Sequence, residues 1–180
     1  MTGREGGEPV WVTNATHPVS SKLALAQATV HRFNDAARVN ELHRFVQNAF
    51  RDLPIDPPSS VLKETAADFA ARLKSETCFV IEADGHLVGS VFCAPENEAL
   101  YIGRLAVRAD FRRRSVASAL IDAAKAEARR VGAKRMTLGC RIALTSNLAL
   151  FRAHGFVVAG YETHAGFTAP TSYDMELALA

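Results

Sequence analysis

One segment constrains the fold of this chain more than any other: Leu105-Ala-Val-Arg-Ala-Asp-Phe-Arg-Arg-Arg-Ser-Val-Ala117. Its apolar start predicts the end of a strand, its basic middle predicts a short loop, and its small residues predict the beginning of a helix. Backbone N–H groups at a helix start lack partners within the helix and carry partial positive charge, so they attract anionic oxygens. The arginines Arg112, Arg113 and Arg114 add full charges at the same place. This arrangement suits a pyrophosphate group.

The composition is typical of a soluble globular protein. The chain has 180 residues, of which 48% are hydrophobic and 22% are charged, and this length is enough for one domain with a sizeable core. We expect a loosely ordered extension over residues 1–22 and a single domain over residues 23–180. No apolar run approaches the roughly 20 residues that a membrane span needs.

Charge and cysteine usage exclude several classes of function. The net charge is only +2, and the arginine-rich segment offers no aromatic stacking surface, so nucleic-acid binding is disfavoured. The phosphate-binding pattern GxxxxGK[ST] does not occur. Cys78, Cys93 and Cys140 lie in apolar runs, with neither a CxxC pair nor histidines at ligand spacing. They predict buried thiols in a cytoplasmic protein and no metal site.

Apolar periodicity predicts seven strands and four helices in the order β-α-α-β-β-β-α-β-α-β-β. Asn34 or Asp35 can cap the first helix, and Asp84-Gly85 predicts a tight hairpin. A mixed sheet of α/β or α+β type, with helices on both faces, follows. The expected strands cover residues 24–33, 77–83, 86–94, 99–107, 134–140, 156–161 and 173–179, and the helices pass through 39–50, 62–73, 115–131 and 146–154.

Three local motifs occur within this order of elements. The loop Arg112-Arg-Arg-Ser-Val-Ala117 follows Arg/Gln-x-x-Gly-x-Gly/Ala, with Ser in place of the first Gly. The stretch Asn147-Leu-Ala-Leu-Phe-Arg-Ala-His-Gly155-Phe156 follows Asn-x-x-x-Tyr-x-x-x-Gly-Phe, with Phe in place of Tyr. The strand Leu100-Tyr-Ile-Gly-Arg-Leu-Ala-Val107 precedes the loop. By these motifs the chain, from about Ala24 to its end, resembles the GNAT superfamily of N-acetyltransferases.

The resemblance implies a mixed, mostly antiparallel sheet of about seven strands, flanked by four helices and splayed between the fourth and fifth strands. It also implies an acyl-CoA-dependent N-acyltransferase that moves an acyl group, in the first place from acetyl-CoA, to a primary amine by direct attack in a ternary complex. The amine belongs to a small molecule or a peptide, and the protein can form a homodimer. The alternative is a catalytically silent module that binds acyl-CoA, because Phe151 stands where the family has a Tyr as its usual acid.

The same resemblance assigns the residues that bind coenzyme A. Amides from about Arg113 to Ser118 would hold the diphosphate, while backbone groups of the preceding strand pair with the pantetheine arm as an added strand would. A strand amide here would also face the thioester oxygen as charge develops on it. The expected contacts are Leu105, Ala106, Val107, Arg112, Arg113, Arg114, Ser115, Val116, Ala117, Ser118, Asn147 and Phe151.

Two of these contacts leave a question open. Ser115 replaces the family's Gly, and we expect its backbone to be helical already, so that a side chain there is unstrained. Asn147 either caps the short helix that it begins or hydrogen-bonds to the cofactor arm. Phe151 is expected to pack against the cofactor.

The acid and the base are less clearly marked. Glu98 is nearer to the strand than Glu96, although both also suit a solvated turn. A Phe cannot donate a proton, so Tyr161, Tyr173, His164, Ser146 or solvent must protonate the leaving sulfur, and a thiol with a pKa near ~8.5 needs little help. The catalytic candidates are therefore Glu98, Tyr101, His164 and Tyr173.

The acceptor side is predicted from two features. Strict alternation along the fourth strand places Tyr101, Gly103 and Leu105 on one face and Ile102, Arg104 and Ala106 on the other. A lone arginine in an apolar strand is costly unless it is paired or lies at a cavity wall. Arg104 therefore either binds an acidic group of the acceptor or forms a salt bridge to a helix carboxylate. The segment from Tyr161 to Tyr173 has the composition of a binding loop, so Tyr161 joins Arg104 as a candidate substrate contact.

Overall fold

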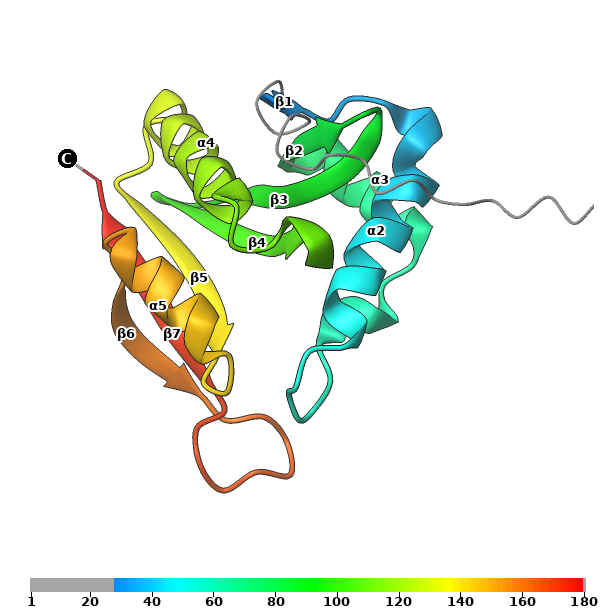
Figure 1. The fold of residues 1–180 in the computed structure, drawn as a ribbon. Helices are drawn as coiled ribbons and strands as arrows, with labels where there is room; N and C mark the ends of the chain where they lie inside the picture. Colours follow the sequence, from blue (N-terminus) through cyan, green and yellow to red (C-terminus); the bar gives the residue numbers. More distant parts are fainter. Residues whose placement is uncertain (1–27, 180) are drawn as a thin grey trace, which may run out of the picture.

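The structure is a computed structural model that describes residues 28–179 (Figure 1). The predicted extension over residues 1–22, and the first residues of the strand predicted over 24–33, lie outside this range. The strands are β1 (Val30–Arg32), β2 (Thr77–Ala83), β3 (His86–Glu96), β4 (Ala99–Val107), β5 (Arg135–Arg141), β6 (Val157–Glu162) and β7 (Ser172–Ala178). The helices are α2 (Val39–Arg51), α3 (Ala66–Ser75), α4 (Val116–Arg130) and α5 (Thr145–Ala153), with short 3-10 turns η1 (Ala36–Arg38), η2 (Ser60–Lys63) and η3 (Ala109–Phe111).

The seven strands form one sheet in the order β1-β2-β3-β4-β5-β7-β6. Every neighbouring pair is antiparallel except β4 and β5, which are parallel. The fold class predicted from the sequence is confirmed. In the described part of the chain, no helix is both long and apolar enough to cross a membrane.

Local sequence signals explain where several elements begin. Asp35 caps η1, because its carboxylate accepts a 2.9 Å hydrogen bond from the backbone N–H of Ala37. Thr65 and Asp68 form a capping box at the start of α3. Asp84 and Gly85 both have positive φ in the turn between β2 and β3, which is the conformation that a two-residue hairpin requires.

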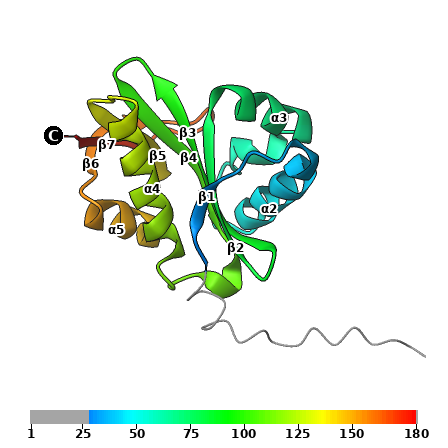
Figure 2. The same ribbon diagram turned by 90° about the horizontal axis from the view of Figure 1, so that it is seen from above.

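The sheet lies between two layers of helices (Figure 2), and each layer encloses a hydrophobic core against it. Helices α4 and α5 cover one face with a core that includes Leu120 and Phe156, while α2 and α3 cover the other face over β1–β4 with a core that includes Leu42 and Phe69. Within the described chain, the core on this second face contains no residue of β5, β6 or β7. This half of the sheet is therefore open toward the space beside α2.

One buried charge ties the N-terminal strands to α4. Glu127 is 4% exposed and accepts hydrogen bonds from Arg130, Arg32 and the Thr77 hydroxyl. These donors, Arg130 above all, hold the pKa of Glu127 at about 2. The carboxylate therefore stays ionised at neutral pH and holds β1 and β2 to the helix.

The middle of β4 contains a bulge that changes the predicted alternation of its side chains. Ser90 of β3 pairs with Ala106, but Phe92 pairs with Gly103, so Arg104 and Leu105 together oppose a single β3 residue. Arg104 has φ of 50°. As a result Leu105 packs into the core beneath α4, and Ala106 faces α2. The prediction that Tyr101, Gly103 and Leu105 share a face is therefore wrong at Leu105. The prediction that Ile102, Arg104 and Ala106 share the other face is also wrong, because Ile102 points into the core beneath α4 while Arg104 and Ala106 face α2 and α3.

Candidate functional site

A gap opens between β4 and β5. The two strands pair over only three residues each, Ala99–Tyr101 with Arg135–Thr137. Beyond these pairs β4 continues to Val107 alongside β3, and β5 continues to Arg141 alongside β7, so the strands diverge (Figure 1). The predicted splay between the fourth and fifth strands is confirmed. The edge of β4 that faces the gap has no ladder partner in the described chain and can accept an extended molecule as an added strand.

Tyr101 stands at the closed end of this gap. It belongs to the last pair of the β4–β5 ladder and lies on the face that α2 covers, since its neighbours Leu100 and Ile102 both point into the opposite core. A Cβ placed on Gly103 would come within 2.9 Å of the Tyr101 ring, and one on Gly139 within 3.8 Å of its hydroxyl. The ring therefore passes over β4, and the phenol reaches β5. Burial raises the pKa of Tyr101, so this phenol is protonated at neutral pH.

The arginine loop lies at the other, open end of β4 and leads into α4. Ser115 is the N-cap of α4, with φ of 63° and ψ of 7°, and its side chain makes no capping hydrogen bond. The expectation that Ser115 is helical is therefore wrong, because its backbone is left-handed. An N-cap serine normally occupies extended angles and bonds a first-turn amide. Here no side chain caps the first turn of α4, so its N–H groups remain available to an anion.

The loop holds a second residue of the same kind. Arg113 has φ of 57°, so two non-glycine residues of this loop are left-handed. Left-handed residues next to right-handed ones turn successive N–H groups toward a common centre, which forms an anion-binding concavity. Such conformations cost free energy and persist only where the surroundings enforce them. The backbone of this loop is thus preorganised for an anion.

Phe111 anchors the loop to the core. It is 3% exposed, and the guanidinium carbons of Arg108 and Arg114 lie 4.4 Å and 5.5 Å from the centre of its ring. Arg108 is also paired with Asp110 at 2.8 Å. Arg112 and Arg113 are exposed and, among residues 28–179, have no ion-pair partner. Their charges are therefore available to an anion bound at the helix start.

A family model matches residues 39–156, which span α2 to the start of β6, and its description is Acetyltransferase (GNAT) family. The chain belongs to the GNAT acetyltransferase family. No curated protein sequence matches it.

Solved structures share this GNAT fold at low sequence identity. A GNAT-family acetyltransferase from Streptococcus pneumoniae is 14% identical with a TM-score of 0.72, and the match covers 86% of this chain and all of that one. The Ard1 protein from Thermoplasma volcanium is 20% identical with a TM-score of 0.68, over 85% of this chain and 98% of that one. A putative acetyltransferase from Salmonella typhimurium, solved with its cofactor acetyl-CoA, is 19% identical with a TM-score of 0.67, over 85% and 94% of the two chains.

Helix α5 carries the second GNAT motif. Its N-cap is Leu144, no side chain caps it, and Asn147 is exposed in its first turn. The structure therefore does not support the capping role for Asn147 and leaves its amide available to a ligand. Phe151 is 7% exposed and packs edge-to-face against Phe156 at 5.9 Å. It is a core residue of α5, and its packing against the cofactor stays a prediction.

The C-terminal end of α5 is joined to the first turn of α4. The Nε2 atom of His154 lies 3.1 Å from the Ser118 hydroxyl, and Lys125 donates a 3.0 Å hydrogen bond to the His154 carbonyl. Burial and the charge of Lys125 lower the pKa of His154, so its imidazole is neutral at neutral pH. These contacts fix the orientation of α4 against α5. The Ser118 hydroxyl is therefore bound to His154, while the backbone amide of Ser118 stays available to an anion at the first turn of α4.

Two charged candidates lie elsewhere than the sequence predicted. Glu98 is 62% exposed and paired with Lys134 before the first residue of β4, at the closed end of the sheet. Glu98 lies six residues before the bulge at Arg104, which corresponds to about 20 Å of extended strand, so Glu98 is removed from the catalytic candidates. Arg104 donates from Nε to Glu64 at 2.8 Å, and Glu64 also pairs with Arg72. Of the two roles considered for Arg104, the structure shows the salt bridge.

The late tyrosines and the loop histidine occupy the C-terminal half of the sheet. Tyr161 and Tyr173 pair across β6 and β7 with ring centres 5.4 Å apart, on the face of α5 and not on the face of Tyr101. Tyr161 is 66% exposed. His164 follows β6, and its Nδ1 lies 2.5 Å from the Thr171 hydroxyl, which closes the base of the β6–β7 loop. The structure does not bring these three side chains together with Tyr101.

The sequence interpretation missed the β5 residues that line the gap. Thr137, Gly139 and Arg141 share the face of Tyr101, because Met136, Leu138 and Cys140 point into the core beneath α4 and α5. The Thr137 hydroxyl is buried, and it has no hydrogen-bond partner in the described chain. Strict alternation in Met-Thr-Leu-Gly-Cys-Arg could have placed these three residues on one face of the strand. Nothing in the sequence says that this strand borders the gap.

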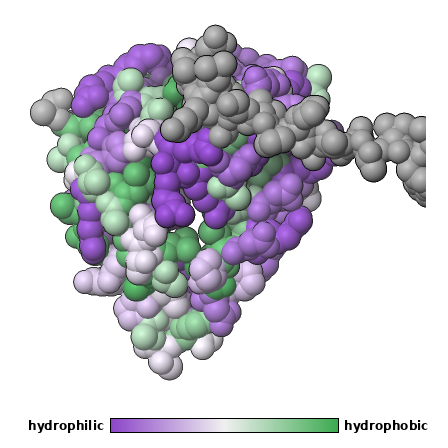
Figure 3. Space-filling view, in the orientation of Figure 1, coloured by the Kyte–Doolittle hydropathy of each residue, from purple (hydrophilic) through white to green (hydrophobic). Residues whose placement is uncertain are grey.

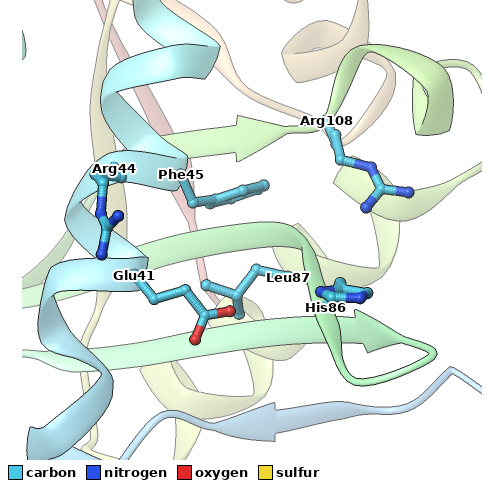
Figure 4. Close-up of a pocket in the computed structure, with 6 residues that line it drawn as sticks. All are labelled: Glu41, Arg44, Phe45, His86, Leu87 and Arg108. Carbon is cyan, nitrogen blue, oxygen red and sulfur yellow. The ribbon is translucent and has the colours of Figure 1, made fainter. Parts of the chain in front are cut away.

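A separate hollow of about 330 Å³ lies between α2 and the beginning of β3 (Figure 4). Phe45 and Leu87 supply its apolar surface, and Arg44, His86 and Arg108 supply polar groups. It is on the β3 side of β4, whereas the gap is on the β5 side. None of the residues predicted from the sequence to form the site lines this hollow.

Proposed function

We propose that the protein is an acyl-CoA-dependent N-acyltransferase that moves an acyl group, in the first place acetyl, to a primary amine. One observation carries this proposal: a preorganised anion-binding helix start lies at the open end of a strand that parts from its neighbour after three residue pairs. A pyrophosphate with a long amide-bearing arm and a reactive end fits both features. Within the family, structures of the Salmonella typhimurium protein and of a Bacillus subtilis acetyltransferase hold acetyl-CoA and CoA, which supports this donor.

The donor would be held by main-chain groups and charge. The amides from Arg113 to Ser118 bind the diphosphate, and the exposed guanidinium groups of Arg112 and Arg113 neutralise it. The pantetheine arm enters the gap and pairs with β4 between Leu105 and Val107. The thioester then lies beside the bulge, where strand amides oppose its oxygen. A preorganised donor of this kind is worth about 3–4 kcal/mol in the transition state.

The acceptor would attack from the face of Tyr101. A neutral amine forms the new C–N bond at the thioester carbonyl, the C–S bond breaks, and coenzyme A leaves as a thiolate. The proton lost by the amine passes to water, because the Asp174 carboxylate of β7 lies against Gly160 of β6, on the side away from β4, and Glu98 lies before the start of β4. We propose that the protonated phenol of Tyr101 donates its proton to this thiolate, which becomes a thiol, and that the phenol regains a proton from water. The buried, unpartnered Thr137 hydroxyl lies on the same face to orient the amine.

A second function remains because of Phe151. The family's usual acid is absent, and the phenyl ring is buried in the core. A protein that binds acyl-CoA without turning it over would show the same loop and the same gap. Release of coenzyme A distinguishes the two functions, since only the transferase releases the thiol when amines are added.

Calorimetry with acetyl-CoA tests the loop. Arg112→Glu places a negative charge at the proposed diphosphate, and Ala117→Trp places a large side chain in the first turn of α4. We expect each to weaken binding about tenfold or more. Arg129→Glu is the matched control, because it makes the same charge change in the last turn of α4 and should leave binding unchanged. Equal affinity in all four proteins would contradict the loop assignment.

Turnover with a panel of amines tests the chemistry. Tyr101→Phe keeps the ring in the gap and removes only the hydroxyl. Because a thiolate leaving group needs little acid help, we expect kcat to fall about tenfold, with acetyl-CoA affinity unchanged. An unchanged kcat would remove Tyr101 from the mechanism. An absence of coenzyme A release with every amine, alongside normal binding, would favour the silent module.

A further inference from the structure

A single arginine bridges the two halves of the molecule on the acceptor side of the gap. Arg141 is the last residue of β5 and lies on the same face as Thr137 and Gly139. Its Nη1 donates a 2.9 Å hydrogen bond to the carbonyl of Pro57, and its Nη2 donates to the carbonyl of Asp56. These acceptors lie 84 and 85 residues earlier in the chain, in the loop between α2 and η2.

The bridged loop belongs to the half of the molecule that carries β4. Residues 52–59 connect α2 to η2, and both of these elements pack onto the β1–β4 face. The other hydrogen bonds of this loop between described residues are local: Leu53 and Ile55 donate to Phe50 and Leu53, and Ser59 accepts from Val61 and Leu62. Arg141 therefore supplies the hydrogen bonds that join this loop to β5 within the described chain. In the space-filling view the surface is hollowed between the two halves and continuous below the hollow (Figure 3).

The hydrogen bonds from Arg141 to Asp56 and Pro57, which we call the bridge, close the outer side of the opening between β4 and β5. At its inner end the opening is bounded by the last β4–β5 pair, Tyr101 with Thr137. At its outer end it is bounded by Arg141 and the loop that Arg141 holds. Arg141 is the fourth residue after Thr137, so the opening is about 13 Å long. An acceptor that reaches the thioester from this face must pass between the two.

We propose that Arg141 is a specificity-determining residue, whose hydrogen bonds to Asp56 and Pro57 limit the cross-section of the acceptor. Slim, unbranched primary amines pass under the bridge, and amines that are branched or flanked by bulk next to the nitrogen do not. This inference rests on the proposed acyl transfer and names the class of acceptor for that site. It concerns the shape of the acceptor, because the N–H groups that Arg141 directs at the loop are held by two backbone carbonyls and fix the position of the loop.

Thiol labelling measures the opening without requiring any acyl transfer. Gly139→Cys places a thiol beside the gap, where the nearest atom to a new Cβ is 3.8 Å away. The native thiols of Cys78, Cys93 and Cys140 are buried, and burial raises the pKa of each, so they react slowly. The two reagents are methyl methanethiosulfonate and a maleimide carried on polyethylene glycol.

In the Gly139→Cys background, we expect Arg141→Ala to raise the rate of the bulky reagent about tenfold relative to the small one, since bonds from a charged donor are strong ones. Arg141→Lys should behave nearly like the alanine variant, because an ammonium cannot span two carbonyls as a planar fork does. Arg135→Ala is the matched control, an exposed arginine on the same face at the closed end of β5. A ratio of rates that is unchanged by Arg141→Ala overturns the inference.

Kinetics with paired acceptors give the second measurement. Linear and tert-alkyl primary amines of equal carbon number are compared by kcat/KM. We expect Arg141→Ala to raise the ratio of kcat/KM for the branched amine to kcat/KM for the linear amine about tenfold, and Arg135→Ala to leave this ratio unchanged. If neither these two nor any amine of the panel is acetylated by the wild-type protein, the proposed transferase function fails, while the labelling ratio still decides the role of Arg141. If both are acetylated with the same ratio in the variant and the wild type, the inference fails and the function stands.

Discussion

Ser115 is the position where the sequence departs from its family and where the backbone is most unusual, so Ser115→Gly tests the cofactor loop directly. The left-handed conformation costs an L-residue about 1–2 kcal/mol, a cost that glycine avoids. Glycine in turn loses more freedom on folding, by about 0.5–1 kcal/mol. The serine side chain is exposed and makes no capping hydrogen bond, so its removal costs nothing further. The net expectation is a gain in unfolding free energy of about 0.5–1 kcal/mol.

The assay is urea denaturation, with Ser115→Ala as the matched control. Alanine removes the hydroxyl but keeps the Cβ, so it should leave the unfolding free energy within about 0.3 kcal/mol of the wild type. For a chain of this size a gain of 1 kcal/mol also raises the melting temperature by about 2–4 °C. Acetyl-CoA affinity should stay within about threefold in both variants, because the amides that bind the diphosphate are unchanged. A glycine variant that is less stable than the wild type, or an alanine variant that gains as much, would refute the assignment of strain to the Cβ of Ser115.

Three further changes test the packing and charge around the site. Gly89→Ala would place a Cβ 2.6 Å from Val116 at the start of α4, so we expect a loss of about 1–3 kcal/mol in urea denaturation, against almost none for Gly139→Ala, whose nearest atom is 3.8 Å away. Glu127→Gln should cost about 2 kcal/mol at pH 7. Because the pKa of Glu127 is lowered to about 2 from 4.5, its stabilisation is complete above pH 4.5 and is lost as the pH falls toward 2, so the variant should show a shallower acid-side decline in melting temperature. Phe151→Tyr should keep the fold and change turnover only modestly, and a large rise in coenzyme A release would show that the native protein lacks its acid.

The sequence predicted the elements of this fold because their signals are local. Hydrophobic alternation placed the strands over 77–83 and 99–107 at their observed bounds, and the hairpin at Asp84-Gly85 follows from the backbone freedom of those two residues. The helix begun by the arginine loop was also located correctly. Its N-terminal geometry was not, since Ser115 is left-handed and makes no side-chain capping hydrogen bond. Side-chain identity alone predicts the opposite, because serine caps helices from extended angles.

The composition of the site depends on contacts between distant segments. Thr137, Gly139 and Arg141 matter because β5 pairs with β4 over only three residues, and Arg141 matters because a loop more than 80 residues earlier comes within its reach. No periodicity within β5 encodes either fact. The prediction that Glu98 is a catalytic residue rested on its closeness in sequence to the fourth strand. That closeness does not say at which end of the strand β4 and β5 part, and Glu98 lies at the paired end.

Arg104 shows how one added residue changes a functional conclusion. Under strict alternation its guanidinium would lie in an apolar face without a partner, and an acidic acceptor would be the natural ligand for it. The bulge turns Arg104 onto the face of α2 and α3, where Glu64 accepts from it and where the aromatic ring of Phe92 lies 6.0 Å away. Arg104 also favours the ionised form of Glu64, whose pKa is lowered even though its burial acts to raise that pKa. The charge for which an acidic acceptor was the natural ligand is therefore neutralised within the protein, which removes Arg104 from the candidate acceptor contacts.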